Sequence, residues 1–197
     1  MRNIEVIRKI FNELYQDKDG IHISLAERKR LNIGSKEFVY GEVVFDTFVD
    51  LLKKAGINEN DIFYDLGSGL GKPCLIASLV FDVKKAVGIE LLPALYQLST
   101  EIAQKASQLV PDLKNLIFLN QDMLEADFSD GTLVFCNSTC LSEESLAKLE
   151  KKFEKLQSGS RVILITKKIE NENLSLKEEG EVKMTWGMAT FRIYERK

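Results

Sequence analysis

The sequence predicts an α/β protein built on a doubly wound sheet, and two observations carry this prediction. Short apolar runs of strand length alternate with longer segments of helical period along most of the chain. One apolar run, 62–64, leads directly into Asp65-Leu66-Gly67-Ser68-Gly69-Leu70-Gly71-Lys72, after which a helical pattern starts at Pro73. That succession predicts a buried strand, a tight glycine-rich turn and the N-terminus of a helix.

Two helices are expected ahead of the sheet. Apolar residues at helical spacing predict the first over 4–14. The second is expected from Ser24, where Ser24-Leu25-Ala26-Glu27 matches a capping box, to Gly34. Its basic run, 28–30, is interpreted as a solvated helix face, with a substrate-facing patch as the alternative. Residues 1–37 are therefore assigned to an N-terminal helical extension or cap, and 38–197 to the main domain.

The remaining elements follow from the same patterns. A helix is expected over 44–55, and Tyr40-Gly41-Glu42 lies in the loop before it. Beyond the glycine-rich turn, strands are expected over 86–90, 116–120, 132–136 and 161–166, and helices over 73–80, 95–109 and 142–156. The last part of the chain alternates like antiparallel strands. Its charged segment 170–180 is interpreted as a mobile connection or a hairpin excursion.

Length and charge limit the classes of protein that the chain can belong to. With 197 residues and 45% hydrophobic content, it can bury one sizeable core. A net charge of -3 and no strongly basic tail leave no global field for nucleic acid, so strong nucleic-acid binding is not expected. The apolar stretches are strand-sized, and the first residues lack a signal-peptide pattern. We therefore expect a soluble, cytoplasmic protein with no membrane partner.

The cysteines and the histidine predict neither disulfides nor a metal site. Cys74 and Cys136 lie inside apolar runs, and with Cys140 they make an odd number, which favours reduced core thiols. His22 is the single histidine, and no CxxC pair is present. No metal is expected.

The spacing of the glycine-rich turn separates two classes of ligand. Dinucleotide sites use G-x-G-x-x-G with a helix N-terminus facing a pyrophosphate, whereas this turn reads G-x-G-x-G and follows Asp65. A carboxylate there would repel a phosphate but suits the cationic amino group of an amino-acid-like ligand. The pattern resembles the first motif of class I S-adenosylmethionine-dependent methyltransferases, which implies S-adenosyl-L-methionine as cofactor. A glycine turn of purely structural use is the alternative.

Acidic residues also follow the next two predicted strands. Glu90 ends the strand 86–90, where a carboxylate can accept two hydrogen bonds from ribose hydroxyls, and a solvated strand-end charge is the alternative. Asp122 and Met123 follow the strand 116–120. The acid can accept from the exocyclic amine of adenine while the methionine covers a ring face. The alternative is a turn aspartate beside a core methionine.

These motifs together resemble a known family. In order and spacing they are similar to the non-SET histone-lysine methyltransferases of the disruptor-of-telomeric-silencing (Dot-one-like) family. The motifs are Tyr40-Gly41-Glu42, 65–71, Gly88-Ile89-Glu90, Gln121-Asp122-Met123 and Asn137. The resemblance covers roughly 38–165. It implies a Rossmann-like, seven-stranded class I methyltransferase sheet, mostly parallel with an antiparallel last strand.

The resemblance also implies roles for the site residues. Tyr40 and Glu42 would close a loop on the methionine end of the cofactor, which Asp65, Gly67 and Gly69 would line. The remaining cofactor residues would be Glu90 at the ribose and Asp122 and Met123 at the adenine.

On the acceptor side, the resemblance places Asn137 where the methyl group meets the incoming amine, and Trp186 on the wall of a lysine channel. We include Phe191 as a third channel candidate. The family's aromatic hydroxyl in the terminal strand has no secure match, because Phe191 and Tyr194 both fall slightly out of register. The sequence Ser138-Thr139-Cys140 after Asn137 is smaller and more polar than in the family.

The function expected from this comparison is methyl transfer to the side chain of a lysine in a protein, which need not be a histone. One alternative is a small-molecule or nucleic-acid methyltransferase on the same cofactor platform. Against base-amine chemistry, Asn137-Ser138-Thr139-Cys140 lacks an Asn-Pro-Pro-aromatic signature. Another is a catalytically silent fold that binds partners through its leading helices. Oxidation with a nicotinamide cofactor is disfavoured by Asp65 and the glycine spacing.

Overall fold

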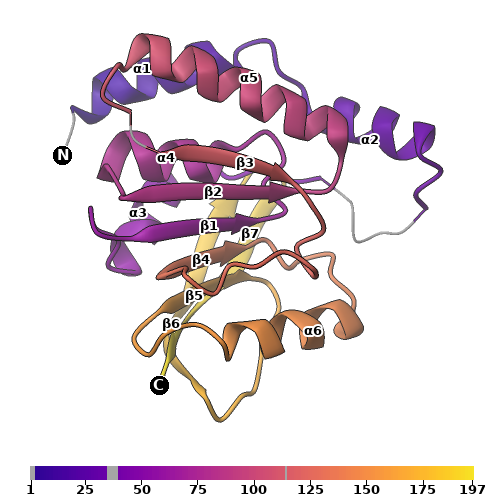
Figure 1. Ribbon diagram of the computed structural model, residues 1–197, viewed down its shortest axis with the longest axis vertical. Helices are drawn as coiled ribbons and strands as arrows, with labels where there is room; N and C mark the ends of the chain where they lie inside the picture. The colour runs from indigo at the N-terminus through magenta and orange to yellow at the C-terminus, as the bar shows by residue number, and fades with distance from the viewer. Residues whose placement is uncertain (1–2, 35–39, 114) are drawn as a thin grey trace.

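The computed structural model describes residues 3–34, 40–113 and 115–197 (Figure 1). Its helices are α1 (Ile4–Tyr15), α2 (Gly20–Arg30), α3 (Phe45–Lys54), α4 (Lys72–Phe81), α5 (Pro93–Leu109) and α6 (Glu143–Phe153). Its strands are β1 (Ile62–Leu66), β2 (Lys85–Glu90), β3 (Leu116–Asn120), β4 (Leu133–Cys136), β5 (Arg161–Ile165), β6 (Leu174–Met184) and β7 (Gly187–Arg196). Each strand and helix expected from the sequence has a counterpart here.

The described strands form a single mixed sheet in the order β3-β2-β1-β4-β5-β7-β6. β1 to β5 are parallel, whereas β7 runs antiparallel to β5 and β6 runs antiparallel to β7. The chain order reverses between β1 and β4, which creates a switch point where ligands of such sheets bind. The predicted α/β fold class, a mostly parallel sheet with an antiparallel end, is confirmed.

Helices cover both faces of the sheet, as doubly wound topology requires. In Figure 1, α1, α3, α4 and α5 lie on one side and α6 on the other. Two clusters of buried residues fill the spaces between these layers, one including Phe48 and Leu79 and the other including Leu149 and Phe153. The strands of the central sheet are apolar on both faces because both faces are covered.

The N-terminal helix α1 packs into the same core as the sheet. Asn3 caps it by accepting from the backbone N–H groups of Glu5 and Val6. Its buried face, which includes Ile7 and Phe11, belongs to the larger buried cluster. Tyr15 donates its hydroxyl to the backbone carbonyl of Leu70 at 3.0 Å. The helix that the sequence assigned to an extension therefore contacts the glycine-rich turn directly.

Both predicted bounds of α2, Ser24 and Gly34, are wrong, because the helix spans Gly20–Arg30. The helix begins at Gly20, and Asp19 caps it by accepting from the backbone N–H of His22 at 3.0 Å. Ser24 lies inside the helix and is buried. Aspartate is as good a cap as serine, and the earlier cap is the one used.

Of the two interpretations of 170–180, the mobile connection is wrong for most of the segment and the hairpin is confirmed. Leu174 to Gly180 form the first part of β6, paired with β7 across a register shift between Leu176 and Glu178. β6 is the edge strand of the sheet, so the charged side chains that suggested a loop lie on an exposed edge. In the part of the chain that is described, no helix has the length and apolar character needed to cross a membrane.

Candidate functional site

The glycine-rich turn has the backbone conformation that its sequence requires. Gly67, Gly69 and Gly71 have φ angles of 79°, 54° and 80°. These left-handed values are unfavourable for residues with a Cβ atom. Gly71 is the N-cap of α4, and Pro73 lies in its first turn as predicted. The turn passes directly from β1 into α4 at the carboxyl edge of the sheet.

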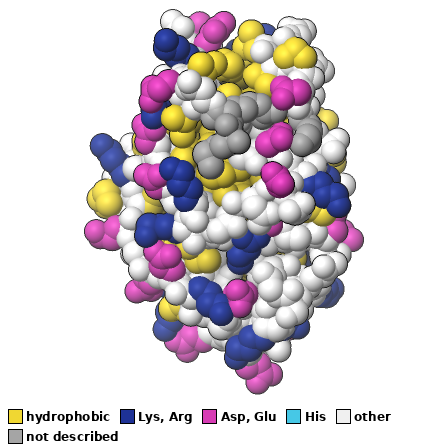
Figure 2. Space-filling view, turned by 90° about the vertical axis from the view of Figure 1, so that its left-hand side faces the viewer, with side chains coloured by type: hydrophobic (Ala, Val, Ile, Leu, Met, Phe, Trp, Pro, Cys, Tyr) yellow, Lys and Arg dark blue, Asp and Glu magenta, His cyan; other side chains and the backbone are white. Residues whose placement is uncertain are grey.

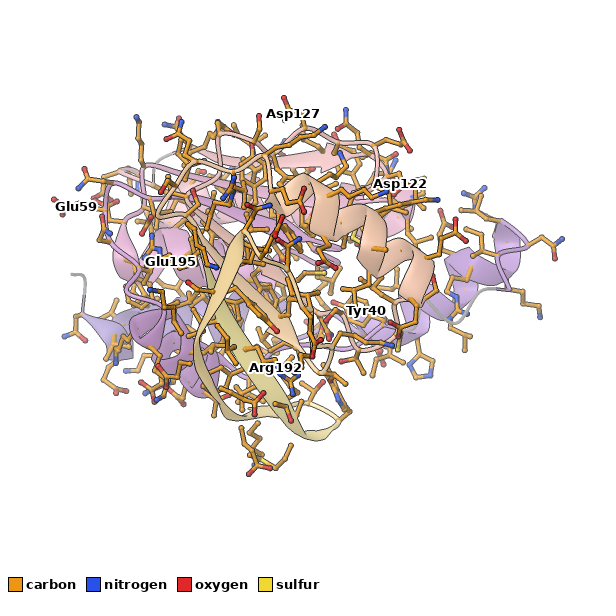
Figure 3. All side chains as sticks on the ribbon, turned by 90° about the horizontal axis from the view of Figure 1, so that it is seen from below. Tyr40, Glu59, Asp122, Asp127, Arg192 and Glu195 are labelled. Carbon is orange, nitrogen blue, oxygen red and sulfur yellow. The ribbon has the colours of Figure 1, made fainter. Side chains whose placement is uncertain are left out.

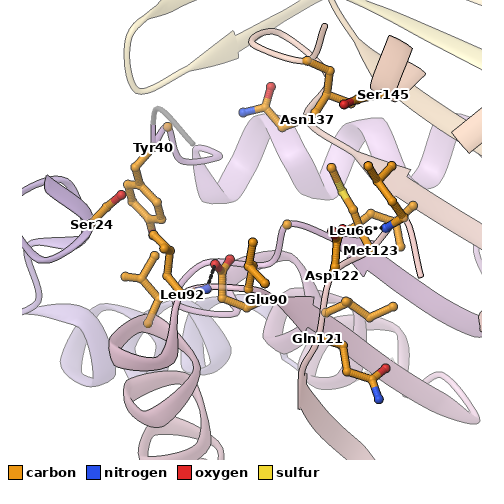
Figure 4. A pocket seen from close by; sticks show the side chains of 17 residues that line it. Ser24, Tyr40, Leu66, Glu90, Leu92, Gln121, Asp122, Met123, Asn137 and Ser145 are labelled. Carbon is orange, nitrogen blue, oxygen red and sulfur yellow. Dashed lines mark hydrogen bonds between the residues drawn. The ribbon is translucent and has the colours of Figure 1, made fainter. Parts of the chain in front are cut away.

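A cavity of about 210 Å³ opens at this edge (Figure 4). Its walls come from α2, the loop before α3, the ends of β1 and β2, the start of α5, the turn after β3, the loop after β4, and α6. Polar wall residues include Ser24, Tyr40, Glu90, Asp122, Asn137 and Ser145. Figure 3 shows Tyr40 and Asp122 toward one end of the molecule and Glu59 and Glu195 toward the other. The cavity therefore lies where an open α/β sheet binds its ligand.

A smaller cavity of about 30 Å³ shares a wall with the first. Tyr40, Gly41, Gly67 and Asn137 line both cavities. The smaller one adds charged residues that the larger one lacks, which are Glu42, Asp65 and Lys72. Both spaces are thus lined by carboxyl side chains, and the smaller one adds a lysine.

Asp65 is a buried carboxylate with an unused acceptor. It is the last polar residue of β1, one position before the end of the strand, and it is 2% exposed. Among the described residues, no donor reaches its Oδ2 atom. Burial, with a smaller contribution from the charge of Glu90, raises the pKa of Asp65 well above its ordinary value. A buried, unpaired acceptor is unfavourable for the free protein, and a cationic donor would relieve it.

Glu90 is buried, and each of its carboxylate oxygens accepts a backbone hydrogen bond. Its Oε2 accepts from the backbone N–H of Gly69 at 2.7 Å, and its Oε1 accepts from the backbone N–H of Leu92 at 2.8 Å. Burial raises the pKa of Glu90, while these backbone bonds act in the opposite direction. The carboxylate is held rigidly in the cavity wall, and each oxygen keeps a further lone pair for a ligand hydroxyl.

Tyr40 and Glu42 form a polar cluster with Lys72. Tyr40 donates its hydroxyl to Oε1 of Glu42 at 2.7 Å, and Lys72 forms an ion pair with Oε2 of the same carboxylate. The Tyr40 ring packs so closely between Gly20 and Gly69 that a Cβ atom at either glycine would collide with it. Burial and the charge of Glu42 raise the pKa of Tyr40 well above its ordinary value. The Tyr40 hydroxyl therefore stays protonated and acts as a donor.

The loop 40–44 is joined to the turn between β6 and β7. Val43 forms an isolated bridge with Met184, and the backbone N–H of Thr185 donates to the carbonyl of Glu42 at 3.0 Å. The Trp186 ring packs against Gly41, where a Cβ atom would collide with it. Trp186 is nevertheless 43% exposed. Trp186 itself lines neither of the two cavities, but Gly41, on which its ring packs, lines both.

Asp122 and Met123 lie in the wall of the larger cavity. Oδ1 of Asp122 accepts from the backbone N–H of Leu124 at 2.8 Å, which fixes the turn after β3. Figure 4 shows Met123 beside Leu66 and both on the side of the cavity opposite Tyr40. The structure thus brings together Tyr40, Glu42, Asp65, Gly67, Gly69, Glu90, Asp122, Met123 and Asn137 around one pair of cavities.

Phe191 does not belong to this group. It is 3% exposed in β7, packs on Gly180 and belongs to the larger core cluster. The nitrogen of Lys54, on α3, lies 6.0 Å from its ring centre. Phe191 lines neither of the two cavities. The prediction that it forms part of an acceptor channel is not supported by this position, which is structural.

Sequence reasoning missed some of the wall. Ser24 and Ser145 reach the larger cavity from α2 and α6, and Lys72 reaches the smaller one from the start of α4. Only Lys72 carried a signal, since it directly follows the glycine-rich turn. The positions of the helices that carry the two serines depend on packing between distant parts of the chain. A short sequence motif cannot predict such packing.

Comparison with known proteins identifies relatives. The family described as "Histone methylation protein DOT1" matches residues 22–190. An H3 lysine-79 specific histone-lysine N-methyltransferase of Kluyveromyces lactis is 28% identical over 137 residues, which is 64% of this chain and 24% of that protein. A protein-lysine N-methyltransferase of Saccharolobus islandicus is 32% identical over 114 residues, covering 57% of this chain and 66% of the relative. The matched region thus spans about a quarter of the yeast relative.

Solved structures share the fold. An RNA methyltransferase from Salinibacter ruber, solved with S-adenosyl-L-homocysteine, superposes with a TM-score of 0.62 at 28% identity. That superposition covers 77% of this chain and 91% of the other. A magnesium protoporphyrin IX methyltransferase from Synechocystis also has a TM-score of 0.62, over 96% of this chain and 90% of the other, at 15% identity. The second likeness concerns the fold alone. With the family match extending over most of the sheet and its cavities, the chain belongs to the DOT1 family of histone methylation proteins.

Proposed function

We propose that this protein is an S-adenosyl-L-methionine-dependent methyltransferase that methylates a lysine side chain of another protein. The observation that carries the proposal is the unpartnered, buried Oδ2 of Asp65 beside the glycine-rich turn. An orphaned carboxylate oxygen suits an ammonium group and would repel a pyrophosphate. Family membership and the methyltransferase relatives support the same assignment.

The amino-acid end of the cofactor would occupy the smaller cavity. Asp65 would accept from the ammonium group, and Lys72, although paired with Glu42, supplies the one positive side chain in the described wall for a carboxylate. The glycines leave room for the ligand against the backbone of the turn. The residues present therefore fit a zwitterionic amino-acid group.

The nucleoside end would occupy the larger cavity. Glu90 would accept from ribose hydroxyls through the lone pairs that Gly69 and Leu92 leave free. Asp122 and Met123 would contact the adenine from the exit of β3. The apolar walls of this cavity suit a flat base better than a charged group.

When bound, the cofactor supplies an activated methyl group, so the protein mainly has to align the acceptor. Asn137 lies in the wall common to both cavities, and the partly exposed Trp186 ring packs on Gly41, which lines both cavities as well. The acceptor amine would approach between these two residues. A lysine must lose its proton before it can attack, and removal of water by the Trp186 ring favours the neutral amine.

Binding is tested first by calorimetry with S-adenosylhomocysteine and, in parallel, with NADH. We expect saturable heat with the first compound and none with the second. Glu90→Gln should weaken binding, whereas Glu59→Gln, at the opposite end of the molecule, should not. Binding of NADH alone would overturn the proposal.

The acceptor is tested by incubating the protein with S-adenosylmethionine labelled in its methyl group and with lysates of several origins. Label in protein, mapped to lysine by mass spectrometry, is the expected result. Label in RNA would favour the second candidate function, which the 28% identity to an RNA methyltransferase supports. Binding of cofactor without label in any acceptor would favour a silent binding module.

We also propose a cytoplasmic location. It is supported by Cys74 and Cys136, which are buried, unpaired thiols of the kind retained in reducing compartments.

Basic and acidic side chains are interspersed over the face shown in Figure 2, so that face offers no single-sign patch for nucleic acid.

A further inference from the structure

The orientation of the Asn137 amide is set by a hydroxyl of its own loop. Thr139 donates its Oγ1 hydroxyl to Oδ1 of Asn137 at 2.8 Å. No described residue accepts from the other end of this amide, its nitrogen. Figure 4 shows that nitrogen on the side of Asn137 that faces Tyr40 across the pocket. The half-buried Asn137 therefore offers the shared wall of the two cavities a donor, not an acceptor.

A second threonine supports the first. Oγ1 of Thr166, at the end of β5, lies 2.9 Å from Oγ1 of Thr139. When the Thr166 hydroxyl donates to the Thr139 oxygen, the Thr139 hydroxyl hydrogen remains free to donate to Asn137. The three side chains then form two hydrogen bonds that point in the same direction. The two threonines come from loops after different strands, β5 and β4. Their contact therefore depends on the sheet and not on local sequence.

The backbone of Thr166 is held in a conformation that a threonine would otherwise avoid. Its φ angle is 72°, in the left-handed region that is unfavourable for β-branched residues. Strand β7 enforces it from both sides. The Thr166 N–H donates to the carbonyl of Thr190 at 2.7 Å, and its carbonyl accepts from Nη1 of Arg192 at 2.8 Å. Strain that is enforced in this way gathers at functional sites.

We propose that Thr139 and Thr166 are positioning residues, which hold the Asn137 amide with its nitrogen toward the two cavities so that it acts there as a hydrogen-bond donor. A donor at this point disfavours an ammonium group, which is itself a donor, and favours an atom with a free lone pair. The inference rests on the proposed function only for the identity of the bound molecule. The orientation itself is a property of the free protein.

The first test needs no ligand. In the 15N-labelled full chain, the side-chain amide signals of Asn137 are identified by their loss in Asn137→Ala. We expect Thr139→Val, which keeps the shape of the side chain but removes the hydroxyl, to shift these signals and speed their exchange with water. Thr139→Ser, which keeps the hydroxyl, should restore the wild-type signals. Unchanged signals in Thr139→Val would overturn the proposal.

The second test compares two ligands. S-adenosylhomocysteine is neutral at sulfur, whereas sinefungin carries an ammonium group at the position of the transferred methyl. We expect Thr139→Val to free the amide to turn its oxygen inward. Binding of sinefungin relative to S-adenosylhomocysteine should then improve roughly threefold to tenfold. Thr139→Ser and Thr166→Ser should keep the wild-type ratio, and Thr166→Ala should move it in the same direction as Thr139→Val.

A purely structural role would weaken both ligands together and leave their ratio unchanged, which would contradict the positioning role. If the wild-type protein binds neither compound, the proposed function fails. The amide signals in the free protein still decide the orientation of Asn137, so the two failures can be told apart.

Discussion

The Glu90 carboxylate is bonded to the backbone N–H of Gly69, with 2.7 Å between Oε2 and nitrogen. This bond ties the end of β2 to the glycine-rich turn after β1, so the two walls that would hold the ribose and the amino-acid end share one anchor. A change at Glu90 therefore alters both the ligand contacts and the shape of the turn.

Glu90→Ala should accordingly reduce both binding and stability. It leaves two backbone N–H groups, those of Gly69 and Leu92, without their acceptor, which costs roughly 1–3 kcal/mol of unfolding free energy. We expect the dissociation constant for S-adenosylhomocysteine to rise about tenfold or more. Calorimetry and chemical unfolding measure the two effects. Glu59→Ala serves as control, and an unchanged dissociation constant would remove Glu90 from the ribose site.

Asp65→Asn should stabilise the free protein in a pH-dependent way. Burial raises the folded pKa of Asp65, so the folded state holds this proton more tightly than the unfolded chain, whose pKa is about 3.9. The charged form therefore opposes folding, and stability is lost as pH rises toward the folded pKa. Asparagine cannot ionise and removes this loss.

We expect the unfolding free energy of Asp65→Asn, relative to wild type, to increase by roughly 1–3 kcal/mol between pH 4 and pH 7. Binding of S-adenosylhomocysteine should weaken in the same variant. Urea unfolding at both pH values measures the first effect. Asp50→Asn, an exposed aspartate paired with Lys53, is the matched control. A relative stability that does not change with pH would contradict the assignment.

Lys72→Met should discriminate between ligands that differ at one end. Methionine keeps most of the length of the side chain but removes the charge that faces the smaller cavity. We expect binding of S-adenosylhomocysteine to weaken about tenfold, whereas 5′-methylthioadenosine, which lacks the amino-acid group, should be little affected. Calorimetry with both compounds tests this, with Lys53→Met as control. Equal weakening of both compounds would place Lys72 in a structural role with Glu42.

Trp186 should report binding by its fluorescence. It is the single tryptophan of the chain. Its ring packs on Gly41, whose neighbour in sequence, Tyr40, lines the cavity. We expect its emission to shift when S-adenosylhomocysteine binds, because Gly41 both lines the cavities and contacts the ring. A titration should give the same midpoint as calorimetry at matched concentrations. Binding that leaves the emission unchanged would show that loop and ring do not move together.

Thr166→Asn should stabilise the protein, because asparagine tolerates the left-handed conformation better than a β-branched residue. We expect a gain of about 1 kcal/mol, which raises Tm by about 2–4 °C in a chain of this size. Thr166→Ala removes the branch at Cβ but lacks the side-chain amide that lets asparagine bond to its own backbone, and it should give a smaller gain. Thermal unfolding measures both. A lower Tm for Thr166→Asn would mean that the hydroxyl contributes more than the strain removes.

The cofactor side of the site could be predicted because its residues lie in short contiguous motifs. Asp65 and Glu90 are the last polar residues of adjacent parallel strands, and such ends meet at one edge of a sheet. The acceptor side could not be predicted in the same way. Both faces of the sheet are covered, so the alternation of side chains does not say whether Phe191 points toward the site or into a buried layer. It lies in the larger buried cluster.

The N-terminal helices illustrate the same limit. The pattern of α1 predicted a helix but not its target, which is the turn at Leu70. The start of α2 was misplaced because Ser24 and Asp19 both carry capping chemistry, and only tertiary packing selects between them.

The ring of Tyr40 rests between two positions that have no side chain, Gly20 on α2 and Gly69 in the turn. A natural substitution at Gly20 would thus displace Tyr40 and impair ligand binding, although Gly20 lies in a helix that the sequence assigned to an extension outside the main domain. Screens for inactive alleles should therefore recover Gly20 together with the residues of the glycine-rich turn.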